Sequence, residues 1–94
     1  MITLEEVKLF LRIDNNEEDS LLSSLLDTSI DLVEGVIRQK LITFEPLPET
    51  LKQAVLYCVA TMYENRQIEK DGVQIPEMLD MVKRLTFAYR KEAF

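Results

Sequence analysis

Residues 48–67 (PETLKQAVLYCVATMYENRQ) constrain the fold more than any other part of this chain. Pro48 suits the first position of a helix, because its missing N–H would have no intrahelical partner there. Apolar residues then surround most of the helix, with Leu51 and Cys58 on one side and Leu56 on the other. Such a helix must be covered from several directions. We therefore expect an all-α fold, a small single-domain bundle of about four helices around this central apolar helix.

Capping signals predict a helix near each end of the chain. Thr3 followed by Glu6 is a capping-box pattern, which indicates a short helix over residues 4–11. Pro76 is expected to open the last helix, with a basic outer face. The buried stripe of that last helix is expected to contain Met78, Met81, Val82, Leu85 and Tyr89.

A longer helix is expected between these two, ending near residue 38. Asn15 or Asn16 is expected to cap it, and the carboxylates of residues 17–19 would fill its first turn, where they complement the helix dipole. Ser29 interrupts the apolar arc of this helix. We expect its hydroxyl to bond back to a carbonyl one turn earlier.

Residues 39–47 lack helical periodicity but are apolar for a connector. Leu41 and Phe44 either pack down on the bundle or project and dock on a partner, and packing is the favoured alternative. Residues 68–75 are expected to form a polar loop before the last helix. Residues 1–94 are expected to form one domain, because the chain contains no internal repeat and no linker-like segment.

The composition argues against catalysis. The chain has no histidine, which removes the commonest general base and the commonest transition-metal ligand. Its single cysteine, Cys58, lies in the most apolar segment and is expected to be an inert core residue. Residues 14–19 resemble a calcium loop only in part, because Asp19 stands where that loop needs glycine. We expect no enzyme activity, no catalytic residue, no bound metal and no cofactor.

The net charge is −6, which argues against sequence-independent binding to nucleic acid. The charge is unevenly placed, with nine acids and two bases in residues 1–34 and four bases and one acid in residues 83–94. This polarity either reflects two differently solvated faces or serves head-to-tail association. The chain also lacks a secretion-signal pattern and a membrane-spanning segment, and its lone cysteine fits a reducing cytoplasm.

Several segments together resemble the phage gp6-like head–tail connector (head completion, or adaptor) family of tailed bacteriophages and prophages. They are TLEEVKLFLRID followed by EEDSLLSSLLDTSIDLVE, then LPETLKQAVLYCVATMYENRQ, and a terminal helix that ends LTFAYR. The resemblance covers nearly the whole chain, and the connector at residues 39–45 is its least diagnostic part. It implies a non-enzymatic, largely helical subunit that assembles after DNA packaging as a ring of about a dozen copies beneath the portal.

The resemblance also implies partners and a location. The partners would be further copies of the chain, the portal protein and the downstream head-closure or tail protein. DNA would pass through the ring without specific binding, and no membrane would be involved. The protein would be made in the bacterial host cytoplasm and reside at the head–tail junction of the virion. A small helical partner-binding regulatory module and a helix-turn-helix DNA-binding protein are the alternative functions.

Candidate contact residues follow from the charge pattern and from this resemblance. The two sides of the subunit contact are expected to be an acidic face of the second helix and the basic C-terminal end: Asp27, Asp31 and Glu34, and Lys83, Arg84, Arg90 and Lys91. Tyr63 and Arg66 either satisfy carbonyls at the helix end or anchor a subunit contact. The candidates for docking to the portal or the following protein are Leu41, Phe44, Val73 and Ile75.

Overall fold

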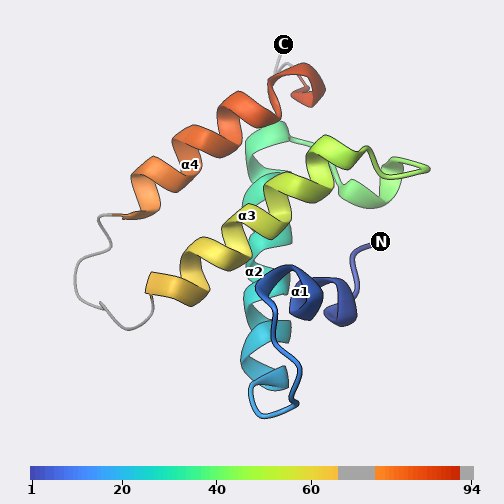
Figure 1. Cartoon of the computed structure of the whole chain (residues 1–94). Helices are drawn as coiled ribbons and strands as arrows, with labels where there is room; N and C mark the ends of the chain where they lie inside the picture. Colours follow the sequence, from blue (N-terminus) through green and yellow to red (C-terminus); the bar gives the residue numbers. More distant parts are fainter. Residues whose placement is uncertain (66–73, 92–94) are drawn as a thin grey trace.

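The computed structural model describes residues 1–65 and 74–91 of the 94-residue chain. This part of the chain contains four α-helices and no strand, which confirms the predicted all-α class (Figure 1). The helices are α1 (Leu4–Leu11), α2 (Asp19–Ile37), α3 (Glu49–Asn65) and α4 (Gln74–Leu85), with the short 3-10 helices η1 (Leu41–Thr43) and η3 (Phe87–Tyr89).

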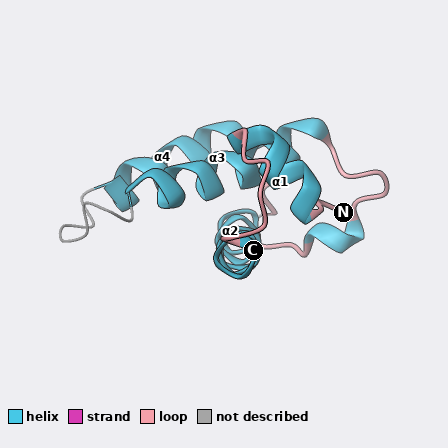
Figure 2. Cartoon of the chain, turned by 60° about the horizontal axis from the view of Figure 1, so that its bottom comes forward, coloured by secondary structure: helices cyan, strands magenta, loops and turns pink. Residues whose placement is uncertain are grey.

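The helices are arranged in two layers. α1, α3 and α4 lie side by side in one layer, and α2 crosses beneath them, seen end-on in Figure 2. α3 contacts all three other helices as expected of a central helix, and α2 does so as well. The subunit is consequently flat, with principal extents of 43 × 31 × 16 Å.

α3 contributes more of the core than any other described helix. Its buried residues are Leu51, Ala54, Val55, Leu56, Cys58 and Val59. The helix begins one residue later than predicted, because Pro48 precedes it and contributes only a carbonyl, which accepts the N–H of Lys52 at 3.1 Å. The predicted end of this helix lies outside the described residues. Cys58 is a buried core residue, as predicted, and burial raises the pKa of its thiol to about 11, which disfavours the reactive thiolate.

α1 begins and ends where the sequence predicts. The Thr3 hydroxyl accepts the N–H of Glu6 at 3.1 Å, and the Glu6 carboxylate accepts the N–H of Thr3 at 2.8 Å, which completes the capping box. The second carboxylate oxygen of Glu6 accepts a hydrogen bond from Nζ of Lys52 in α3 at 2.8 Å. The cap of α1 therefore also joins α1 to α3.

α2 begins later than predicted. Asn15 does not cap the helix, because its side-chain oxygen accepts the N–H of Glu17 at 3.0 Å in a local turn. The helix begins at Asp19, which is the one acidic residue of its first turn. Nζ of Lys8 lies 2.8 Å from the Asp19 carboxylate, and this ion pair holds the start of α2 against α1.

The expected back-bond of Ser29 is absent. Its side chain is fully buried, and its hydroxyl has no hydrogen-bond partner among the described residues. Thr86 provides the contrast, because its buried hydroxyl donates to the Val82 carbonyl at 2.7 Å. The close packing of α2 therefore leaves one buried hydroxyl without a hydrogen bond among the described residues.

The connector packs down on the bundle, which was the favoured alternative. Leu41 is fully buried, and the ring of Phe44 meets that of Tyr89 edge-on, with centroids 5.8 Å apart. Leu41 is therefore a core residue of the subunit. The same segment leaves Ile42 on the surface with 77% of its side chain exposed.

The last helix differs from the prediction in its start and its buried stripe. α4 begins at Gln74, so Pro76 lies within the first turn, where a missing N–H is tolerated. Met78 and Val82 are buried as predicted, but Met81 is 36% exposed. The buried stripe instead runs through Met78, Val82 and Thr86 at intervals of four residues, and the Thr86 N–H still donates to the Val82 carbonyl at 2.9 Å.

Candidate assembly surface

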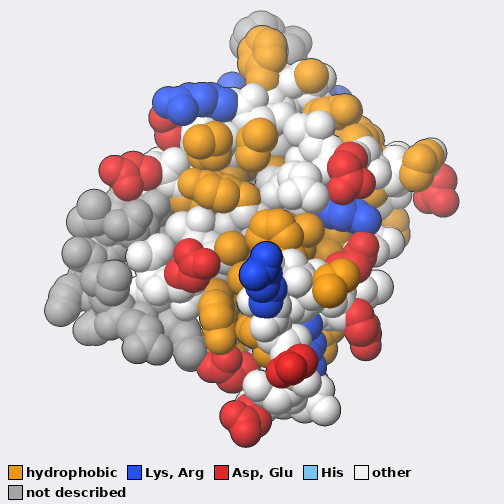
Figure 3. Space-filling model, viewed as in Figure 1, with side chains coloured by type: hydrophobic (Ala, Val, Ile, Leu, Met, Phe, Trp, Pro, Cys, Tyr) orange, Lys and Arg blue, Asp and Glu red, His pale blue; other side chains and the backbone are white. Residues whose placement is uncertain are grey.

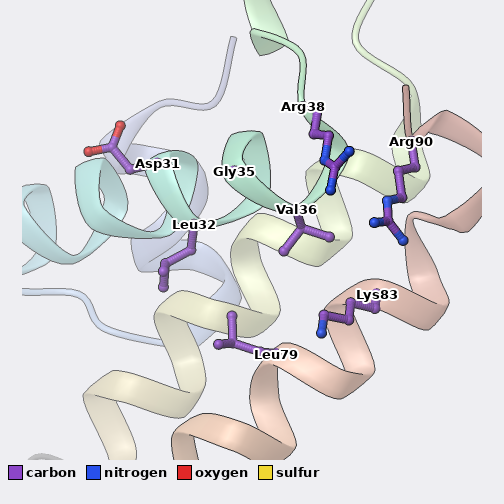
Figure 4. A pocket seen from close by; sticks show the side chains of 8 residues that line it. All are labelled: Asp31, Leu32, Gly35, Val36, Arg38, Leu79, Lys83 and Arg90. Atoms are coloured by element: carbon purple, nitrogen blue, oxygen red, sulfur yellow. The ribbon is translucent and has the colours of Figure 1, made fainter. Parts of the chain in front are cut away.

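An open groove of about 420 Å³ lies between the C-terminal half of α2 and α4 (Figure 4). Its lining residues are Asp31, Leu32, Gly35, Val36, Arg38, Leu79, Lys83 and Arg90. Leu32, Val36 and Leu79 are half-buried and form its apolar floor. We call this site the basic groove, because three of its lining side chains are cationic.

The three cations, Arg38, Lys83 and Arg90, gather at one end of the groove, and Asp31 lies at the other (Figure 4). All three are exposed, and none of them forms an ion pair with another described residue. Clustered like charges repel one another, so an anionic partner placed here would be attracted by all three. The groove is therefore suited to an acidic partner that also carries an apolar group.

Backbone contacts hold this end of the groove together. Arg38 follows α2 with a left-handed backbone, φ 62°, and its N–H donates to the Glu34 carbonyl at 2.8 Å. The N–H of Lys91 donates to the Ile37 carbonyl at 2.8 Å. The Gln39 side-chain amide adds a bond of 2.7 Å to the Tyr89 carbonyl. These bonds bring the segment that carries Arg90 alongside the end of α2.

Gly35 forms an open part of the groove wall. A Cβ atom built at this position would have no neighbouring atom within 4 Å. Gly35 also borders an adjoining hollow whose other lining residues include Glu34, Gln39 and Lys40. Side chains larger than alanine would therefore project into the groove rather than into the core.

The predicted contact residues are distributed differently from expectation. Asp31 lies on the same groove as Lys83 and Arg90, so these acidic and basic candidates are not on separate faces of the subunit. The Glu34 side chain is 14% exposed, accepts the N–H of Leu41 at 2.8 Å and lies 3.7 Å from Nζ of Lys40. Glu34 therefore orders the connector within its own subunit.

The other charged candidates remain at the surface. Asp27 is exposed on α2, and Lys91 is exposed at the end of the described chain. Arg84 is exposed on α4 and pairs with Asp80 one turn earlier at 2.8 Å. An exposed i,i+4 pair of this kind is worth only about 0.3–0.5 kcal/mol, so Arg84 can still exchange partners on assembly.

The remaining candidates belong mainly to the fold or lie outside the described residues. The Tyr63 hydroxyl donates to the Glu18 carboxylate, which ties α3 to the start of α2. Phe44 is half-buried against Tyr89. Three candidates lie outside the description: Arg66, Val73 and the side chain of Ile75.

Sequence reasoning missed two residues of this surface. Arg38 was expected at the end of a helix and was not among the contact candidates, although the helix end faces the basic C-terminal segment. Phe87 was part of the segment expected to continue the last helix, yet its side chain is 78% exposed. It borders a hollow that adjoins the basic groove and shares Val36, Lys83 and Arg90 with it. A basic segment interrupted by an aromatic residue was the signal that the sequence offered.

The described residues hold no group of acidic or cysteine side chains that could bind a metal ion. No helix in this part of the chain is both long and apolar enough to cross a membrane. A family model described as phage gp6-like head-tail connector protein matches residues 1–93. No curated protein and no solved structure matches the chain.

Proposed function

The chain belongs to the phage gp6-like head-tail connector protein family, and from this premise we propose that it assembles into a ring below the portal. The family is one of structural phage proteins, so the chain is a virion component with a role in phage assembly. The proposed ring extends the DNA channel and docks the next head-completion or tail protein. The family match over residues 1–93 is the observation that carries the proposal.

The basic groove supports a ring of head-to-tail contacts. In a closed ring each subunit presents one face to a different face of its neighbour, so the two faces need not resemble each other. The groove concentrates three cations that form no ion pair with another described residue, on a subunit whose net charge is −6. We propose that Lys83 and Arg90, with the adjoining Arg84 and Lys91, form one side of the subunit contact. Charge complementarity with an acidic neighbour would then select partner and orientation.

The acidic balance also supports passage of DNA without specific binding. Binding to duplex DNA depends on many cations that neutralise phosphates along the backbone. Here the net charge is −6, and three of the described cations that form no ion pair with another described residue gather in one groove. If a neighbouring subunit covers that groove, the assembled ring offers the DNA few cations. The exposed Ile42 side chain, in η1 of the connector, is our proposed contact with the portal or the following protein.

Electron microscopy of the purified protein, alone and mixed with the portal protein of the same phage, tests this proposal. We expect closed rings that bind coaxially at one end of the portal. A chain that remains monomeric in both samples, or that binds portal as single isolated subunits, would contradict ring formation.

A further inference from the structure

We propose that the basic groove of one subunit receives the acidic tip of α1 from a second copy of the same chain. We define the acidic tip as Glu5, Leu9 and Asp14, which line one hollow beside the α1–α2 turn. This inference rests on the proposed ring, because it names the two faces that meet in it. It departs from the expectation that the acidic side of the contact lies on α2.

The groove calls for a partner with a specific composition. Its cations are unpaired among the described residues, and its floor consists of the half-buried Leu32, Val36 and Leu79. An acidic partner without an apolar group would leave this apolar floor exposed to water. An apolar partner without acids would leave the cations unpaired in a partly desolvated site. A matching surface therefore presents an apolar side chain between carboxylates.

The acidic tip has this composition. Leu9 is 81% exposed, the highest value among the large apolar side chains of the described residues. Glu5 lies one helical turn before it, and Asp14 borders the same hollow. Neither carboxylate forms an ion pair within the described chain. Residues 4–19 contain six acids and two bases, a balance of −4.

The cations near the tip offset only part of its charge, because the balance of −4 over residues 4–19 already counts both bases. Lys8 is occupied within the subunit, because its Nζ lies 2.8 Å from the Asp19 carboxylate and 2.7 Å from the Asn16 side-chain oxygen. Arg12 is the other base, at the end of α1. Figure 3 shows acidic side chains gathered at the lower end of the subunit, where the chain passes from α1 to α2.

The position of the tip requires a contact between copies. α3 lies between α1 and α4 in both cartoon views, so the tip cannot reach the groove of its own subunit (Figures 1 and 2). Tip and groove are different surfaces, which makes their contact heterologous and able to propagate from copy to copy. Phe87, 78% exposed beside the groove, offers a further apolar surface for Leu9 or the adjacent Phe10 of the neighbour.

A charge-swap experiment tests the contact. The groove variant carries Lys83→Glu and Arg90→Glu, and the tip variant carries Glu5→Lys and Asp14→Lys. Each variant alone places like charges across the contact, and we expect its association constant to fall at least about tenfold. An equimolar mixture restores opposite charges at every contact, because wild-type tip meets wild-type groove and swapped tip meets swapped groove. Sedimentation velocity and native mass spectrometry should then show assemblies that contain both variants in equal numbers.

Two controls accompany the swap. Circular dichroism and urea denaturation establish that each variant is folded, since all four positions are exposed. Asp27→Lys, an exposed acid of α2 outside the tip and the groove, changes the net charge by the same amount per residue as Glu5→Lys. We expect Asp27→Lys to leave the association constant within about twofold of the wild type, because solvent and salt screen a charge outside the contact.

The same measurements, made free in solution and on the portal, separate this inference from the proposed function. Rings formed equally well by each variant alone would overturn the tip-to-groove contact and leave the ring standing. A mixture that associates no better than its components would also overturn it. Normal self-association with lost binding to portal or to duplex DNA would assign the groove to that other partner. Wild-type subunits that associate in neither setting would overturn both proposals.

Discussion

The backbone N–H of Lys91 donates to the carbonyl of Ile37 at 2.8 Å, so the last described residue of the chain is bonded to the last residue of α2. This bond joins two residues that are 54 positions apart in the sequence. It brings Arg90 next to Arg38 and thereby creates the cationic end of the groove. The assembly surface is therefore a product of tertiary structure and not of a contiguous motif.

Substitutions at Gly35 distinguish the effect of filling the groove from the effect of damaging the fold. Gly35→Ala should raise the free energy of unfolding by about 0.5–1 kcal/mol, because alanine is the better helix former and its Cβ meets no atom within 4 Å. Gly35→Trp should leave the fold intact and block the groove, so that subunit association falls. Urea denaturation and sedimentation velocity measure the two effects. Association of the Trp variant at the wild-type level would show that the groove is not the contact.

Ser29 and Thr86 form a matched pair of buried hydroxyls. Ser29→Ala should stabilise the protein by up to about 1 kcal/mol, because it removes a polar group that has no partner among the described residues. Thr86→Val should instead cost about 1 kcal/mol, because it removes the hydrogen bond to the Val82 carbonyl at 2.7 Å. Chemical denaturation in urea compares the two. A destabilising Ser29→Ala would indicate that this hydroxyl has a partner after all.

The core helix α3 should be sensitive to truncation. Leu51 is fully buried, and Leu51→Ala should lower the free energy of unfolding by about 2–5 kcal/mol through lost burial and a residual cavity. Ile42 is the control, because it is 77% exposed and its replacement by Ala should change stability by less than about 0.5 kcal/mol. Thermal and urea unfolding monitored by circular dichroism give both values. Equal effects at the two positions would contradict the packing described for α3.

The link between α1 and α3 should make stability depend on pH. Hydrogen bonds from Lys52 and from the Thr3 N–H lower the pKa of Glu6 below 4.5, and the bond to Glu6 raises the pKa of Lys52 above 10.5. The Glu6 contribution is therefore present above pH 4.5 and is lost as the pH falls through the lowered pKa. The Lys52 contribution is present below pH 10.5 and is lost as the pH rises through the raised pKa.

Substitutions at the two positions test this link. In the Glu6→Gln variant the free energy of unfolding should fall less between neutral and acidic pH than in the wild type. Lys52→Met should remove part of the same pH dependence of stability. The double variant should lose about as much stability as either single variant and less than the sum of the two losses. Both substitutions break the same hydrogen bond, the one of 2.8 Å between Lys52 and Glu6. Urea midpoints measured from neutral to acidic pH provide the comparison. Strictly additive effects would mean that the two side chains act independently.

Local signals predicted the fold well where they act alone. The Thr3–Glu6 capping box predicted the bounds of α1, because both of its hydrogen bonds form within four residues. The start of α2 was missed because Asn15 satisfies a turn N–H before the helix begins. The exposure of Met81 was missed because positions three and four residues apart both fit a helical stripe, and the structure buries the four-residue series Met78, Val82 and Thr86 instead of Met81.

The assembly surface could be predicted only in part. Lys83 and Arg90 stood out as part of a basic segment, and the structure places both in the groove. Their proximity to Arg38 depends on the long-range bonds of Lys91 and Gln39, which no local pattern encodes. Glu34 looked like a surface acid, because sequence periodicity does not show that its carboxylate turns back to the Leu41 N–H.

A cryo-electron microscopy map of the protein bound to its portal would show directly which surfaces join the subunits. We expect a closed ring in which the groove between α2 and α4 of each subunit is covered by the acidic tip of the next. In that map Lys83 and Arg90 should lie within hydrogen-bonding distance of Glu5 and Asp14 of the neighbouring subunit. A ring whose basic grooves face the DNA channel or open solvent, with subunits joined elsewhere, would contradict it.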